Sequence, residues 1–360
     1  MPRYSPSEYN AAGDILRDST KGDHDRSGAM DIIGNLRAAH AYPMEQAFFI
    51  LGQFAKRCDD SSITAQRLKR VESIELKLAH QPKMRLTQMQ DIGGCRVIVK
   101  DPYALKKLSD MVLYFGLADA VDTFQVRLRN DYIAKPKDDG YRSIHMVANY
   151  VEPKTEYKGL KVEIQLRTQY QHVWATTVEI CQFFKQQRFK TQQKTADKKW
   201  LRYFALASGI FVALEGGAPV SGIPFTIQEI QNEMLEIDKE CEITTALTIW
   251  SSVAVPLPFH NDPFAAHHFY VLDLRAKERT LESAGYPKEM LEAAEQRYIQ
   301  LEKEADGDLS RQVVLVSADS LQLLRSAYPN YFVDASRFVS LMSNPKTLVL
   351  PPNAGLSTGD

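Results

Sequence analysis

The chain has 360 residues, which is enough to bury a sizeable core and to divide into two or three domains. Its formal net charge of −1 excludes a uniformly basic nucleic-acid coat, so any phosphate-binding surface is a local patch. The four cysteines form no CxxC pair, which argues against a zinc ribbon or a disulfide framework and is typical of a reducing cytoplasm. Because we find no stretch with the pattern of a signal peptide or a membrane span, we expect a cytoplasmic protein without membrane contact.

The first half of the chain reads as helices followed by alternating strands and helices. Apolar residues at spacings of three and four predict helices over residues 7–17, 29–40, 44–57 and 62–80. The polar stretch STKGDHDRSG is expected to be a loop between the first two helices. Short apolar or alternating segments predict strands over residues 94–100, 123–128, 143–150 and 160–166. Further helices are expected over residues 104–116 and 169–184.

The second half changes in composition. The basic segment QQRFKTQQKTADKK precedes a predicted helix that runs to Leu214, and Thr226 is the predicted N-cap of a helix over residues 226–248. Beyond the Pro-rich VPLPFHNDP, HFYVLDL and QVVLVSA are predicted strands, with helices over residues 287–304 and 337–342. PPNAGLSTGD is expected to be a disordered tail. We therefore expect an α/β (α+β mixed) fold: a mixed sheet flanked by helices, a helical linker and a small C-terminal α/β domain.

Cations gather in the segment RLKRVESIELKL. Spacings of three, four and seven bring Arg70, Ser73 and Lys77 near one helical face. With Arg67 and Lys69, this group suits a triphosphate, because few acids balance it at the same spacing. A solvated charged helix is the alternative interpretation.

Two acids stand beside predicted strands. Asp91, in MQDIGGCRVIV, precedes a strand and a Gly-Gly pair that lets the backbone approach a ligand; it is a natural Mg²⁺ ligand beside phosphates. In VEIQLRT, alternation displays Glu163, Gln165 and Arg167 on one face. Glu163 is therefore a candidate general base or second metal ligand. A simple turn at Asp91 and an exposed polar strand face are the alternatives.

The segment DYIAKPKDDGYRSIH combines a ring with several cations. Tyr141 offers a surface for base stacking, worth about 1–3 kcal/mol per base. Lys135, Lys137 and Arg142 offer charge to phosphates, and His145 offers a hydrogen-bond donor. Packing of Tyr141 and burial of His145 are the alternatives. Taken together, the four segments describe a nucleoside triphosphate, a metal ion, a base catalyst and a second nucleotide.

These segments, in order, resemble the signature blocks of the RelA/SpoT nucleotide pyrophosphokinase domain over about residues 45–185. The resemblance implies transfer of the β,γ-pyrophosphate of ATP to a ribose 3′-hydroxyl with Mg²⁺. It implies catalytic and metal-binding roles for Asp91 and Glu163. It implies ATP contacts from Arg67, Lys69, Arg70, Ser73, Lys77 and Arg96. It implies acceptor contacts from Tyr141, Lys137, Arg142, His145, Gln165 and Arg167.

Residues 260–345 resemble the antitoxin part of fused CapRel-type toxin–antitoxin proteins. In that family the synthetase pyrophosphorylates the 3′-CCA end of tRNA, and a YxxY element occupies the ATP site until a phage capsid protein binds. The matching element here is Tyr328-Pro329-Asn330-Tyr331, whose two rings would be autoinhibitory. Packing of both tyrosines within the small domain is the alternative.

The resemblances imply an autoinhibited toxin for anti-phage defence. The expected divisions are N-terminal helices (1–44), pyrophosphokinase (45–190), helical connector (191–255), regulatory domain (256–345) and tail (346–360). Candidate tRNA contacts are Lys56, Arg57, Arg127 and Arg129, with ordinary surface charge as the alternative. Two other functions stay open: synthesis of guanosine tetra- or pentaphosphate from ATP and GDP or GTP, and an inactive nucleotide-sensing module. No hydrolase domain is expected to precede the synthetase, nor a cysteine-bearing regulatory tail to follow it.

Overall fold

Eight strands of the described residues form one mixed sheet, in the order β3-β4-β5-β2-β1-β8-β6-β7. The computed structural model describes residues 1–18, 20–116, 123–152, 156–184, 195–224, 226–252, 269–275, 278, 280–305, 308, 311–317, 325–330, 332 and 334–343. The strands are β1 (Ile63–Leu68), β2 (Gly93–Val99), β3 (Phe124–Asp131), β4 (Ile144–Tyr150), β5 (Lys161–Thr168), β6 (Phe269–Arg275), β7 (Thr280–Tyr286) and β8 (Arg311–Ser317). The expected mixed α/β class is confirmed.

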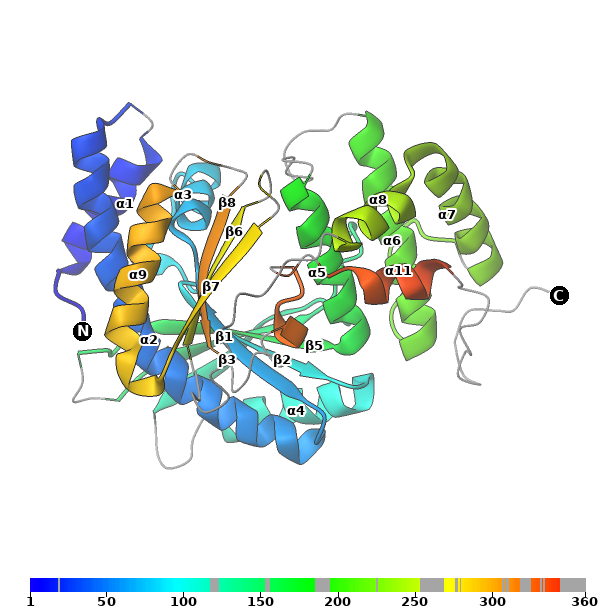
Figure 1. Cartoon of the computed structure of the whole chain (residues 1–360). Coiled ribbons are helices and arrows are strands. Elements are labelled where there is room, and N and C mark those ends of the chain that lie inside the picture. The colour runs from blue at the N-terminus through cyan, green and yellow to red at the C-terminus, as the bar shows by residue number, and fades with distance from the viewer. Residues whose placement is uncertain are drawn as a thin grey trace.

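Helices pack around this sheet, with α1, α2 and α9 on one side of Figure 1 and α5 to α8 with α11 on the other. They are α1 (Pro6–Arg17), α2 (Asp23–Cys58), α3 (Val71–His80), α4 (Pro102–Phe115), α5 (Gln169–Phe184), α6 (Thr195–Glu215), α7 (Ile227–Cys241), α8 (Ile243–Ser252), α9 (Leu291–Glu304) and α11 (Ser336–Ser343). Two 3₁₀ turns are η1 (Leu86–Gln88) and η2 (Lys288–Met290). Within the described part of the chain, no helix has both the length and the apolarity to cross a membrane.

The central strands bring the predicted site residues together. β2 runs parallel to β5, so Gly94 lies opposite Glu163 and Arg96 opposite Gln165. β1 runs antiparallel to β2, which places Arg67 opposite Gly94. Because side chains alternate across a strand, Cys95 and Val97 join the core beneath α2 and α4, while Arg96 lies on the other face.

The C-terminal strands extend this sheet. β8 pairs with β1 through Gln66 opposite Ser317 and Arg67 opposite Val316. Both faces of β8 are buried, since Val313 packs with the core under α9 and Val314 with the core on the opposite face. An apolar run such as QVVLV is what a strand covered on both faces requires. The division of the chain into domains stays a prediction, but the sheet itself runs continuously across it.

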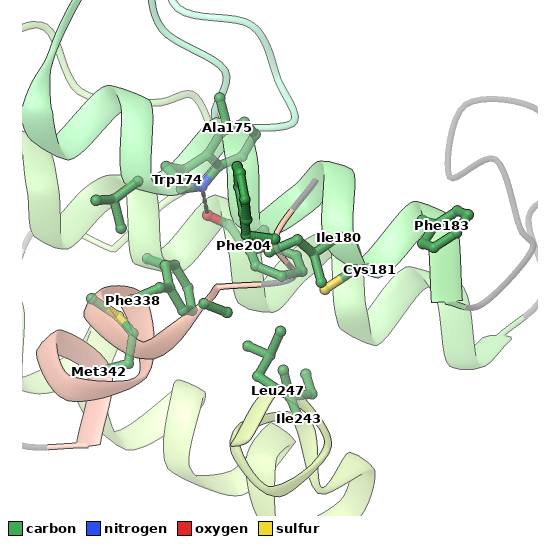
Figure 2. Packing of buried hydrophobic residues seen from close by; sticks show 14 of the residues in the cluster. Trp174, Ala175, Ile180, Cys181, Phe183, Phe204, Ile243, Leu247, Phe338 and Met342 are labelled. Atoms are coloured by element: carbon green, nitrogen blue, oxygen red, sulfur yellow. Dashed lines mark hydrogen bonds between the residues drawn. The ribbon is translucent and has the colours of Figure 1, made fainter. Parts of the chain in front are cut away.

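The core on this opposite face of the sheet joins helices α5 to α8 to α11 (Figure 2). The indole N–H of Trp174 on α5 donates to the carbonyl of Phe204 on α6 at 2.7 Å. The ring of Phe338 on α11 lies 5.5 Å from that of Phe204, and Met342 belongs to the same cluster. The last described helix is thus packed against α5 and α6.

Several element predictions were wrong in detail. The helix expected over residues 62–80 is the strand β1 followed by α3, because β2 and β8 pair with residues 63–68. The loop expected at STKGDHDRSG is short, since α2 begins at Asp23 and continues through Pro43. Thr226 does cap its helix, but Glu242, with φ of +49°, ends α7 and separates it from α8. VPLPFHNDP and the tail lie outside the described residues.

Candidate active site

Many predicted residues of the first half line two cavities that share part of their lining, whereas Tyr141, Arg142 and Arg167 line neither. The larger has a volume of about 760 Å³ and the smaller about 110 Å³. Arg67, Asp91 and Glu163 line both. Other predicted residues around the larger cavity are Arg70, Ser73, Lys77, Arg129, Lys137 and His145. Those around the smaller cavity are Lys69, Arg96, Gln165 and Tyr328.

A strand-to-helix turn presents the cations. Arg67 lies in β1, and Lys69 and Arg70 follow the strand. The expectation that these residues share one helix with Ser73 and Lys77 was therefore wrong. The amide of Lys69 donates to the carbonyl of Ile92 at 2.8 Å, which ties the turn to the segment carrying Asp91. The cations therefore reach the cavities from two elements, one on each side of the turn.

The glycine pair before β2 serves two different purposes. Gly94 lines the smaller cavity, where a Cβ would lie 3.8 Å from the carbonyl oxygen of Glu163. A Cβ on Gly93 would instead lie 3.3 Å from the Cβ of His40 on α2. The pair was expected to let the backbone approach a ligand; this geometry fits Gly94, whereas Gly93 permits packing against α2.

Asp91 lies between two lysines. Lys77 Nζ donates to its Oδ1 at 2.7 Å, and Lys69 Nζ lies 3.1 Å from its Oδ2. Burial raises the pKa of this carboxyl group, but the two ammonium groups outweigh burial and lower the pKa to about 2. Burial also lowers the pKa of Lys69, and Asp91 opposes that shift. Asp91 is therefore ionised at neutral pH and already paired.

Glu163 lies at the end of a series of hydrogen bonds between side chains. Arg167 Nη2 donates to the Tyr141 hydroxyl oxygen at 2.7 Å, and the hydroxyl lies 2.7 Å from His145 Nε2. His145 Nδ1 lies 3.2 Å from Glu163 Oε1, and Gln165 Nε2 donates to Oε2 at 2.9 Å. A neutral imidazole with its proton on Nδ1 satisfies both contacts of His145.

The electrostatics agree with that assignment. Burial lowers the pKa of His145, which keeps the ring neutral at pH 7 despite the nearby carboxylate. For Glu163, burial raises the pKa, but the hydrogen bond from His145 and its other donors outweigh burial and lower it. Glu163 is thus an ionised, 8 % exposed carboxylate at a cavity wall, as a general base requires.

Tyr141 is held on several sides. Its ring makes edge contacts with Tyr132, His145 and Trp174. Lys137 Nζ lies 4.8 Å from the centre of the Tyr141 ring and 4.7 Å from that of Tyr132. Tyr132 lines the larger cavity and was not predicted as a site residue. The available signal was its place in the same segment, nine residues before Tyr141.

Helix α6 anchors the loop that carries Tyr141. The hydroxyl of Ser208 donates to the carbonyl of Gly140 at 2.7 Å. Gly140 has φ of +91°, and a Cβ there would lie 2.8 Å from Ser208 Cβ. Arg142, predicted to contact the acceptor, instead donates to the carbonyls of Ala218 at 2.7 Å and Ile133 at 3.2 Å. Arg142 therefore supports the loop from behind and lines neither cavity.

Tyr328 stands at the wall of the smaller cavity. Its side chain is 1 % exposed, and the Arg96 guanidinium lies 5.4 Å from the ring centre. Arg96 Nη1 also donates to the carbonyl of Ala327 at 3.3 Å. Tyr331, the other predicted autoinhibitory ring, lies outside the described residues.

The predicted tRNA contacts do not form one cluster. Arg129 lines the larger cavity and lies 3.4 Å from Glu163. Arg127 is exposed on the same strand but lines neither cavity. Lys56 donates to the carbonyls of Asp60 and Ser62, and neither it nor Arg57 lines a cavity.

Two carboxylates fit a magnesium ion. Asp91 and Glu163 line the same small cavity, and the negative charge of Asp91 opposes ionisation of Glu163. A divalent cation between them would neutralise this repulsion. Mg²⁺ commonly takes one or two carboxylates together with phosphate oxygens, which matches this pair of acids among lysine and arginine side chains. Asp91 would have to exchange its lysine contacts for the ion.

The comparisons with known proteins find matches to the part of the chain that carries this site. Residues 66–188 match the family described as "Region found in RelA / SpoT proteins". GTP pyrophosphokinase YjbM of Bacillus subtilis is 35 % identical over 113 residues, covering 31 % of this chain and 51 % of the relative. GTP pyrophosphokinase YwaC of the same organism is 30 % identical over 121 residues, covering 31 % and 54 %. The chain thus spans about half the length of these relatives.

Solved structures are also similar over part of the chain. The small alarmone synthetase 1 of Bacillus subtilis, bound to its product pppGpp, is 28 % identical; the match covers 40 % of this chain and 72 % of that one, with a TM-score of 0.34. The family match begins in β1 and includes all the catalytic, ATP-site and acceptor-site residues predicted between Arg67 and Arg167. Residues 66–188 of this chain are therefore similar to the RelA/SpoT region.

Proposed function

We propose that this chain is an ATP-dependent pyrophosphokinase. The observation that carries the proposal is the ionised Glu163, held by His145 at the wall of a cavity that also presents five arginine and lysine side chains. The match of residues 66–188 to the RelA/SpoT region supports it, as do two relatives named GTP pyrophosphokinases. The cavity of about 760 Å³ has the size expected for a small-molecule site.

The proposed reaction is a transfer of pyrophosphate. Glu163 accepts the proton of a ribose 3′-hydroxyl while the hydroxyl oxygen attacks the β-phosphorus of ATP. A new oxygen–phosphorus bond forms, the bond from the β-phosphorus to the bridging α,β-oxygen breaks, and AMP leaves with that electron pair. Bound Mg²⁺ would neutralise phosphate charge, held by Asp91 and Glu163. When phosphates enter, they take over Lys69 and Lys77, which releases Asp91 from its present pairs.

The hydrogen-bonded chain behind Glu163 sets its orientation. Because the Tyr141 hydroxyl is fixed by Arg167, His145 receives its hydrogen bond on Nε2 and keeps its proton on Nδ1. That proton points to Glu163 and stabilises the carboxylate form. In this proposal the Tyr141 hydroxyl orients the base catalyst, and its ring packs against Tyr132 and Lys137, which line the larger cavity.

We propose a guanosine nucleotide as the first acceptor to test, because the relatives are named for GTP. The tRNA 3′ end is the second candidate, favoured by Arg129, which lines the cavity on an exposed strand edge next to Arg127. A tRNA acceptor would make activity fall steeply with salt, because backbone contacts release counterions. An anti-phage role, with a phage capsid protein as activator, stays a prediction.

We also propose that Tyr328 limits access to ATP. Its ring stands beside Arg96 at the smaller cavity, whose other cations are Arg67 and Lys69. A nucleotide base or phosphate that needs Arg96 must displace this contact. Autoinhibition by the C-terminal residues is therefore supported for one of the two predicted tyrosines.

The test is a transfer assay with γ-³²P-ATP and Mg²⁺, run with GDP, GTP and bulk tRNA as separate acceptors. Wild type and Tyr328→Ala are compared with Glu163→Gln, which keeps the side-chain size but cannot accept the proton. We expect label on one acceptor class, higher labelling with Tyr328→Ala, and none with Glu163→Gln. Binding of ATP without transfer to any acceptor, even in Tyr328→Ala, would replace the proposal with a nucleotide-sensing module.

A further inference from the structure

Helix α9, from the C-terminal part of the chain, reaches the turn that carries Lys69 and Arg70. Figure 1 shows α9 alongside α2, and Glu302 of α9 contacts both α2 and the start of α3. Glu302 Oε2 accepts from Arg37 Nη1 on α2 at 2.6 Å. Its Oε1 accepts from the backbone amide of Val71 at 2.8 Å and from the Tyr298 hydroxyl at 2.9 Å.

The hydrogen bond between the Val71 amide and Glu302 caps the N-terminus of α3. The N-cap residue of this helix, Arg70, makes no side-chain capping hydrogen bond, so the first amides of α3 need another acceptor. Glu302 supplies it from 231 residues further along the chain. A carboxylate in this position also interacts favourably with the positive end of the helix dipole.

A buried arginine completes the arrangement. Arg37 is 2 % exposed, and its Nε donates to the carbonyl of Lys69 at 2.8 Å. The same guanidinium contacts the Tyr298 hydroxyl and lies 4.6 Å from the centre of that ring. Burial disfavours the charge, but Glu302 outweighs burial and raises the pKa of Arg37. Arg37 and Glu302 therefore hold the turn at two successive points, Lys69 and Val71.

The front of the same turn faces the cavities. Lys69 lies 3.1 Å from Asp91 in the smaller cavity, and Arg70 lines the larger one. The neighbouring strand β1 is likewise held by β8. The C-terminal part of the chain thus supports the ATP-binding cations from behind, in addition to presenting Tyr328 in front of them.

We propose that Glu302 is a positioning residue that fixes the turn from Lys69 to Val71 for binding of the ATP triphosphate. The inference rests on the proposed function. It gives the C-terminal part a role in ATP binding in addition to the proposed inhibition. Chains cut before α9 would then lose affinity for ATP instead of being released from inhibition.

The test uses two matched double variants of the full chain. Replacing Glu302 alone would leave Arg37 charged and buried, which risks unfolding. Arg37→Met with Glu302→Leu removes both groups, and Arg37→Met with Glu302→Gln restores only an acceptor for the Val71 amide. Lys303→Met is the control, because Lys303 joins α9 to Asp31 of α2 without touching the turn. Circular dichroism checks that each variant is folded.

The readouts are hydrogen exchange of the peptide containing Val71 and affinity for a non-hydrolysable ATP analogue, with and without Tyr328→Ala. We expect the Leu variant to exchange at least tenfold faster and to bind the analogue about tenfold more weakly. The Gln variant should lie between the Leu variant and wild type, because it restores the acceptor for Val71 but not the Arg37 contact with Lys69. The control should stay within about threefold of wild type, and the acceptor KM should change little. Equal behaviour of the Leu and Gln variants, or tighter ATP binding by either, would overturn the proposal.

The two proposals fail in different ways. If Tyr328→Ala binds the analogue but transfers no pyrophosphate, the proposed function is wrong, while exchange and affinity still decide the role of Glu302. If Tyr328→Ala is folded and binds no analogue, both are wrong.

Discussion

Gly140 connects the proposed acceptor loop to α6, and its replacement by alanine tests that connection. A Cβ at Gly140 would lie 2.8 Å from Ser208 Cβ and 3.2 Å from Ala205 Cα, at φ of +91°. The positive φ costs on the order of 1–3 kcal/mol for a residue with a side chain. The collision with a packed helix adds about 1–3 kcal/mol more, unless the loop moves away.

Gly159→Ala is a matched control. Gly159 has φ of +90°, and a Cβ there would meet nothing within 4 Å. Both variants share the backbone strain, so the difference between them isolates the collision with α6. We expect Gly140→Ala to lower the free energy of unfolding by about 1–3 kcal/mol more than Gly159→Ala.

Urea unfolding and steady-state kinetics measure the two consequences. Movement of the loop displaces Tyr141, so Gly140→Ala should raise the acceptor KM while the ATP KM stays near wild type. Ser208→Ala should show a smaller effect in the same direction, because it removes one hydrogen bond worth about 0.5–1.5 kcal/mol. Equal stability of the two alanine variants, with equal acceptor KM, would refute the idea that α6 holds this loop.

Three further predictions concern the charged and aromatic groups of the site. The pKa of Asp91 falls from 3.8 to about 2 on folding, so its pairing contributes roughly 2 kcal/mol to the free energy of unfolding above pH 4. This contribution is lost as pH falls through 2. Urea unfolding should therefore show the stabilities of wild type and Asp91→Asn converging in that range. Asp91→Asn should also abolish transfer at pH 7, and retained transfer would remove it from the metal site. His145→Ala should reduce kcat more than either KM, because it removes the donor that orients Glu163, and an unchanged kcat would contradict the role of His145 in orienting the base. Tyr132→Phe should leave the acceptor KM near wild type whereas Tyr132→Ala raises it, and equal KM values would show that its ring does not serve the acceptor.

The sequence predicted the strands and residues of the site better than the elements that join them. Arg96, His145, Glu163, Gln165 and Arg167 lie on strands whose local patterns are coherent, and β2, β4 and β5 pair in the way these patterns require. β1 was missed because Ala, Gln, Arg and Leu favour helices in isolation, and pairing with β2 and β8 overrides that preference. The edge strand β7 was missed because TLESAGY carries Ser, Gly and Glu, which are poor strand formers.

Roles that depend on contacts between distant residues could not be predicted from the sequence. Arg142 stands in a cationic segment, yet the carbonyl of Ala218 on a later loop draws it away from the cavities. Glu302 stands in an ordinary amphipathic helix, and no local pattern distinguishes it from Glu304, which pairs with Arg311. Only the fold places one of these two acids at the start of α3.

The pairing of β1 with β8 has a consequence for synthesis of the protein on the ribosome. Gln66 pairs with Ser317, so 251 residues must be made after one partner before the other exists. At about 5–20 residues per second, this takes roughly 12–50 s. During that interval the strand bearing Arg67 has one open edge and α3 lacks its Glu302 cap. A chain that is still being translated therefore cannot hold its proposed ATP site in the final geometry, and activity would begin only after nearly the whole chain has been made.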